Sequence, residues 1–145
     1  MTVHYADTSA LVRAYFADEV RHEERREQLL GGSGPVVTSE LARLELTGAV
    51  VAAARAGRIG AAGPLLDRLD ADCGDQGPLA LIRFVPEQAL EEARRLLLAH
   101  RLRSLDALHL AVASSLRAVL ADEIVFVSDD ADQAVAARAE GFAIG

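Results

Sequence analysis

The sequence predicts a single α/β domain, a three-layer α/β/α sandwich with a mostly parallel central sheet. Candidate strands and candidate helices alternate along the chain. The strands are short apolar runs instead of strict alternations of apolar and polar residues, which is typical of parallel sheets covered on both faces. With 145 residues and no internal repeat or low-complexity linker, residues 1–145 are expected to form one domain.

In the first half of the chain, residues 2–6 are expected to form a short strand that ends at Asp7. An amphipathic helix is expected to run from Ser9 through Leu30, where glycines and Pro35 end it. Residues 36–37 suit a buried strand, followed by a helix that Thr38 or Ser39 would cap and that continues to about residue 57. A further helix is expected around residues 61–69.

In the second half, the run LALIRFVP from residue 79 predicts a strand that Pro86 stops. Residues 86–101 form a helix with proline at its start, acids in its first half and arginine towards its end, as the helix dipole favours. Residues 104–120 are the most apolar helix candidate. A buried strand at 123–128, a helix at 129–141 and a final strand at 142–144 complete the expected order.

Composition excludes several classes of function. All 15 basic residues are arginine, so no lysine is present for a Schiff base or a phosphate-binding P-loop. Cys73 is the only cysteine, which rules out an internal disulfide and a thiolate metal cluster. The net charge of −7 argues against a general nucleic-acid coat protein. Without a leader-like start or an apolar run near the roughly 20 residues that span a bilayer, a cytoplasmic protein with no membrane contact is expected.

Four acids lie in apolar surroundings: Asp7, Glu45, Asp106 and Asp130. Ionised carboxylates are rarely left there without partners, which points to a chemical role. Asp7 and Asp130 each follow a predicted strand, at the sheet edge where parallel α/β proteins form binding sites. The alternative for each of these two is an ordinary helix N-cap.

The other two acids are placed by their helices. Glu45 shares its spacing with an apolar stripe that includes Leu41 and Ala49, whereas the neighbouring Glu40 falls on the polar side. Glu45 is therefore the better ligand candidate. Asp106 is the only carboxylate of the most apolar helix and lies in its first turn, where the helix dipole offers an alternative explanation.

An all-oxygen ligand set favours Mg²⁺ or Mn²⁺. Four acids brought within a few ångströms would repel one another, and two bound cations would offset that repulsion. The four histidines show no HxH or HxxxH pairing, which disfavours a zinc hydrolase. His109 lies three residues after Asp106; a role in core packing is favoured, with a place near the site as the alternative.

Four segments occur in a fixed order over nearly the whole chain: YADTSALVR, TSELARLELTGAV, LRSLDALHLAVA and VFVSDDADQAVAARAEGF. Together they resemble the PIN-domain nucleases, and specifically the VapC-like toxins of bacterial toxin–antitoxin pairs. The resemblance implies a PIN-like α/β/α sandwich and an endoribonuclease that depends on Mg²⁺ or Mn²⁺. It also implies RNA as the substrate, a cognate antitoxin as a partner, and a homodimer.

The resemblance also implies site residues. It places the acidic set on Asp7, Glu45, Asp106 and Asp130, with Ser9 and Ser128 as supporting hydroxyls. Asp129 replaces Asp130 if the strand ends one residue earlier. In this scheme the three aspartates of the set hold metal directly, and Glu45 either binds metal or orients the attacking water.

Arg103, beside the Asp106 helix, is the first candidate for guiding RNA, with a solvated flanking charge as its alternative. Arg21, Arg25 and Arg26 alternate with acids and are expected on an exposed helix face. Two other functions stay open. One is a non-catalytic PIN-like module that binds antitoxin or RNA. The other is a phosphatase or phosphotransferase, although ADTSAL lacks the second aspartate of a DxD pattern and the chain has no lysine.

Overall fold

Five short strands form the central sheet of the computed structural model, which describes residues 1–145. They are β1 (Thr2–Ala6), β2 (Val36–Ser39), β3 (Leu79–Ile82), β4 (Glu123–Val127) and β5 (Ala143–Ile144). Every neighbouring pair is parallel, in the order β3-β2-β1-β4-β5. The predicted parallel sheet is confirmed.

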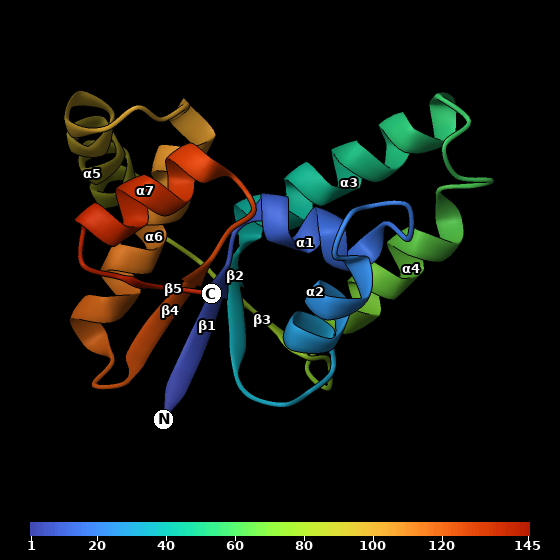
Figure 1. The fold of residues 1–145 in the computed structure, drawn as a ribbon, viewed down its shortest axis with the longest axis horizontal. Coiled ribbons are helices and arrows are strands. Elements are labelled where there is room, and N and C mark those ends of the chain that lie inside the picture. Colours follow the sequence, from blue (N-terminus) through green and yellow to red (C-terminus); the bar gives the residue numbers. More distant parts are fainter.

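Helices cover both faces of the sheet (Figure 1). One layer contains α5 (Pro86–Ala99), α6 (Ser104–Val119) and α7 (Ala131–Ala139). The opposite layer contains α1 (Thr8–Tyr15), α2 (His22–Leu30), α3 (Glu40–Arg55) and α4 (Gly63–Asp72). The three-layer sandwich predicted from the alternation of elements is therefore present. None of these helices is both long enough and apolar enough to cross a membrane.

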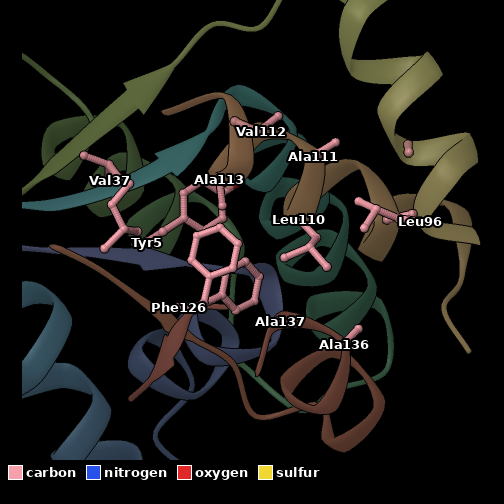
Figure 2. Close-up of a cluster of buried hydrophobic side chains, with 14 of the residues drawn as sticks. Tyr5, Val37, Leu96, Leu110, Ala111, Val112, Ala113, Phe126, Ala136 and Ala137 are labelled. Carbon is pink, nitrogen blue, oxygen red and sulfur yellow. The ribbon is translucent and has the colours of Figure 1, made fainter. Parts of the chain in front are cut away.

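Each face of the sheet has its own apolar core, because successive side chains of a strand point to opposite faces. Tyr5 and Phe126 lie in the core beneath α5, α6 and α7, and their rings stack with centroids 5.4 Å apart (Figure 2). Their chain neighbours Ala6 and Val127 face the core beneath α1 to α4. Strands buried on both sides need continuous apolar runs, which is the pattern seen in the sequence.

The predicted helix from Ser9 to Leu30 is wrong in one respect, since it is two helices. The chain leaves the helical conformation after Tyr15 and re-enters it at His22. Arg58, from beyond the end of α3, holds the intervening turn: its guanidinium pairs with Asp18 at 2.6 Å and with Glu19 at 2.8 Å. The same group lies 4.5 Å from the centre of the Phe16 ring. These long-range contacts favour the turn, and no local breaker marks it.

Smaller differences concern the ends of elements. β2 continues to Ser39, which takes the N-cap position of α3 without a side-chain capping bond, while the Thr38 hydroxyl donates to the carbonyl of Ala6 at 2.6 Å. β4 ends at Val127, one residue earlier than expected.

The strand order determines where a site can form. The chain leaves β1 for β2 and β3 on one side, then returns to place β4 on the other side of β1. The helices that follow β1 and β4 leave in opposite directions, towards the two layers (Figure 1). The carboxyl ends of β1 and β4 thus meet at a topological switch point, where ligands bind in open parallel sheets.

Candidate active site

Asp7 follows β1 at this switch point and is almost fully buried, with 2% of its surface exposed. Its carboxylate accepts hydrogen bonds from the Ser9 hydroxyl at 2.7 Å, from the backbone N–H of Ala10 at 3.0 Å, and from the Ser128 hydroxyl. Asp7 is therefore an N-cap of α1, as one alternative proposed, but all three donors are neutral. Burial raises the pKa of Asp7 in spite of these bonds.

Two serines tie the ends of β1 and β4 together. A hydroxyl has one proton to donate, and Ser9 and Ser128 each direct theirs to Asp7. Their oxygens in turn accept from the backbone: Ser9 from the N–H of Asp129 at 2.9 Å, and Ser128 from the N–H of Asp130 at 3.1 Å. The loop after β4 is thus fixed directly against the Asp7 carboxylate.

Asp106 and Asp130 face a common cation. The Arg103 guanidinium lies 3.5 Å from Asp106 and 3.9 Å from Asp130, although 86% of the Arg103 side chain is exposed. Asp130 also caps α7, accepting from the backbone N–H of Gln133 at 2.9 Å. Burial and the nearby Asp130 carboxylate raise the pKa of Asp106. The three side chains border a pocket of about 250 Å³.

Glu45 projects from α3 and is held on one oxygen. Its Oε1 accepts from the Thr8 hydroxyl at 2.8 Å and lies 2.7 Å from Nε2 of His109. Burial raises the pKa of Glu45, but hydrogen bonds from His109 and Thr8 outweigh it and leave that pKa below its ordinary value. Glu45 is partly buried, beside a stripe that lies one residue further on than predicted: Ala42, Leu46, Val50 and Ala53.

Asp129 has a different environment from Asp130. Both of its oxygens are bound by Arg25, at 2.8 Å from Nε and 3.1 Å from an Nη, and Arg21 lies 3.3 Å away. The prediction that Arg25 lies on an exposed helix face is wrong, because only 2% of its side chain is exposed. Arg26 does lie on the surface, paired with Glu23. Although β4 ends early, it is Asp130 that faces Asp106.

The acids were expected to lie within a few ångströms of one another, and they do not form such a cluster. No three carboxylate, imidazole or thiol groups lie close enough to hold a metal ion as they stand. Asp7 and Glu45 have donors of their own, and Asp106 and Asp130 share Arg103, which limits the repulsion among the acids. The residues nevertheless fit a hard divalent cation: the available donors are oxygens, Asp7 has no cationic partner, and Arg103 already places a positive charge between Asp106 and Asp130. A hollow of about 870 Å³ between α3, α4 and β3 contains none of these acids.

The family of the chain is shown by comparison with known proteins. The model of the PIN domain family matches residues 5–139, which include every residue of the acidic set. The chain belongs to the PIN domain family. Among solved structures, the fold is similar to VapC20 of Mycobacterium tuberculosis, described as a sarcin–ricin loop cleaving toxin, with a TM-score of 0.66 and 19% identity over 96% of this chain and 95% of that chain. No curated protein matches the sequence significantly.

The sequence patterns did not reveal the role of Thr8 in this PIN domain, and they favoured a packing role for His109. Thr8 lies between Asp7 and Ser9, and its hydroxyl binds Glu45 rather than Asp7. His109 is buried, as the packing assignment required, but it also contacts Glu45 and Thr8. The only sequence signal was the position of His109 one helical turn after Asp106, and such spacing does not reveal a contact with α3.

Proposed function

We propose that this PIN domain is an endoribonuclease that depends on Mg²⁺ or Mn²⁺ and acts as the toxin of a toxin–antitoxin pair. The observation that carries the proposal is the burial of Asp7 without a cationic partner, at the switch point and beside the loop that presents Asp130. A buried carboxylate with only neutral donors is costly unless a cation joins it. The PIN family assignment supports nuclease chemistry for the same residues.

In this proposal Asp7, Asp106 and Asp130 hold the cation, and Ser9 and Ser128 keep Asp7 in place for it. When bound, a divalent cation at such a site supplies a water of lowered pKa and neutralises charge on the phosphodiester. Glu45 is anchored through Oε1, so Oε2 is free to orient the attacking water and to accept its proton. Its lowered pKa keeps Glu45 ionised at neutral pH, as an acceptor must be.

We propose RNA as the substrate class. The similarity of the fold to VapC20, a toxin that cleaves the sarcin–ricin loop, supports this choice. Arg103 would bind a backbone phosphate, because its contacts with Asp106 and Asp130 are long and exposed and therefore weak. The phosphatase alternative receives no support from the family assignment. A cognate antitoxin, a homodimer and a cytoplasmic location belong to the proposal through the family resemblance.

The test is cleavage of end-labelled total cellular RNA by the purified chain, freed of any antitoxin. Reactions contain Mg²⁺, Mn²⁺ or EDTA, and Asp7→Asn is assayed in parallel. Discrete fragments that require both the metal and Asp7 are the expected result. Cleavage that persists in EDTA and in Asp7→Asn would reject the mechanism.

A second candidate function is a non-catalytic PIN-like module that binds antitoxin or RNA. The separation of the acids favours it. The module would bind RNA or antitoxin with an affinity that does not depend on the metal concentration, and it would leave every labelled RNA intact. The same cleavage assay therefore separates the two functions.

A further inference from the structure

We propose that His109 is a positioning residue that fixes Glu45 so that one carboxylate oxygen, Oε2, is presented for the reaction. The inference rests on the proposed nuclease function and adds to it a residue outside the acidic set. It starts from a buried polar cluster whose members come from four elements: Tyr5 of β1, Thr8 of α1, Glu45 of α3 and His109 of α6.

His109 is 1% exposed, in the middle of the most apolar helix of the chain. Its Nε2 lies 2.7 Å from Glu45 Oε1 and 3.0 Å from the Thr8 hydroxyl. Its Nδ1 lies 3.2 Å from the Tyr5 hydroxyl. Both ring nitrogens are thus engaged, which is more than packing alone requires.

The partners determine which nitrogen carries the proton. An ionised carboxylate can only accept, so Nε2 must donate to Glu45. The other ring nitrogen, Nδ1, is then left to pair with the Tyr5 hydroxyl. Burial raises the pKa of Tyr5, which keeps this hydroxyl protonated. The Tyr5 ring is held by its stack on Phe126, so this partner of Nδ1 is itself fixed.

The same contacts explain why one oxygen of Glu45 differs from the other. Oε1 receives both the Thr8 and the His109 hydrogen bonds, while no protein group donates to Oε2. A glutamate on a helix has several rotamers, and one hydrogen bond from Thr8 would leave it freer to turn. His109 therefore supplies the second donor that selects one orientation.

The experiment compares His109→Leu, which keeps the volume without a donor, with His109→Gln, whose amide nitrogen can take the place of Nε2. Leu110→Val is the matched control, since it loosens the same buried helix but has no polar contact. We expect kcat for RNA at saturating Mg²⁺ to fall ~10–100-fold in His109→Leu, with KM nearly unchanged. His109→Gln should recover part of this loss, and Leu110→Val should retain the wild-type kcat.

A measurement that needs no activity accompanies the kinetics. Nitrogen NMR of the imidazole in the wild-type chain in EDTA should show a proton on Nε2, and Tyr5→Phe should shift the signal of Nδ1. A ring without a proton on Nε2 would overturn the inference. So would a kcat of His109→Leu equal to that of Leu110→Val, while wild-type cleavage still depends on metal. Absence of any cleavage by the wild type would overturn the proposed function, and the inference with it.

Discussion

At the scale of single residues, Asp7 is where stability and function oppose each other. Its folded-state pKa is raised, chiefly by burial. The folded chain therefore binds this proton more tightly than the unfolded chain does. The contribution of Asp7 to stability is fully present below the ordinary aspartate range and is lost as the pH rises through the raised pKa. At neutral pH the unfolded chain ionises Asp7 freely, whereas the folded chain disfavours that charge.

Asp7→Asn should accordingly raise the melting temperature of the metal-free protein at pH 7, because the amide has no charge to desolvate. The difference from wild type should shrink towards zero below about pH 3.9, the ordinary aspartate pKa. Thermal unfolding in EDTA, followed by circular dichroism across this pH range, checks the expectation. A variant that melts below wild type at pH 7 would show that the hydrogen bonds of Asp7 matter more than its burial.

Arg103 is the second residue with a testable role. Arg103→Ala should weaken RNA binding several-fold and lower the slope of log affinity against log salt by about 1, as loss of one phosphate contact does. Arg55→Ala, an exposed arginine at the far end of α3, is the matched control and should leave the slope unchanged. Binding of catalytically inactive protein to labelled RNA over a salt series measures both. Equal slopes for the two variants would return Arg103 to a solvated flanking charge.

At the scale of elements, the buried pair of Arg25 and Asp129 joins α2 to the loop after β4. A buried ion pair adds little net stability over apolar packing, but removing one partner is costly. Without Arg25, the buried Asp129 would keep only the longer contacts with Arg21 at 3.3 Å and Arg13 at 3.6 Å. The loop held in this way also supplies the backbone N–H that binds Ser9. The pair is thus part of what keeps the Asp7 carboxylate in position.

Arg25→Ala should lower the free energy of unfolding by ~3–5 kcal/mol. Arg26→Ala, on the next position of the same helix and paired only at the surface, should change it by less than ~0.5 kcal/mol. Urea denaturation at pH 7 distinguishes the two. A small effect of Arg25→Ala would mean that water reaches Asp129 once the arginine is gone.

Local sequence patterns predicted the elements that depend on local causes. The strands before Asp7 and Asp130 were found because a parallel sheet needs buried apolar runs, and their carboxyl ends had to share an edge. The break between α1 and α2 was missed because Arg58, distant in sequence, stabilises it. The contacts of His109 with Glu45 and of Arg25 with Asp129 were missed for the same reason, since each joins elements that no spacing rule relates.

At the scale of the whole molecule, a bound cation should link the two helical layers and so stabilise the fold. Asp7 begins α1 in one layer, while Asp106 and Asp130 belong to α6 and α7 in the other. Anything that binds the folded chain alone stabilises it, by about 2.7 kcal/mol at a concentration of 100 Kd. Removal of the metal should therefore lower the free energy of global unfolding, and its effect should not be limited to one loop.

Mg²⁺ or Mn²⁺ should raise the melting temperature of the wild-type protein, and EDTA should reverse the rise. The double variant Asp106→Asn with Asp130→Asn should not respond, although its metal-free melting temperature should be close to or above that of wild type. Differential scanning calorimetry in calcium-free buffer, at increasing concentrations of Mg²⁺ or Mn²⁺, measures the melting temperatures of both proteins. An equal rise in the double variant would place the metal elsewhere on the surface.

The pairing of β1 with β4 also determines when, during synthesis, the site around Asp7 can form. Residues 2–6 align with residues 123–127, so β1 must wait for β4 before Ser9 and Ser128 can both bind Asp7. Synthesis proceeds at ~5–20 residues per second, and contacts this distant in sequence form late. The site around Asp7 therefore cannot assemble on a nascent chain until Ser128 has been made, which at ~5–20 residues per second is ~6–24 seconds after Asp7.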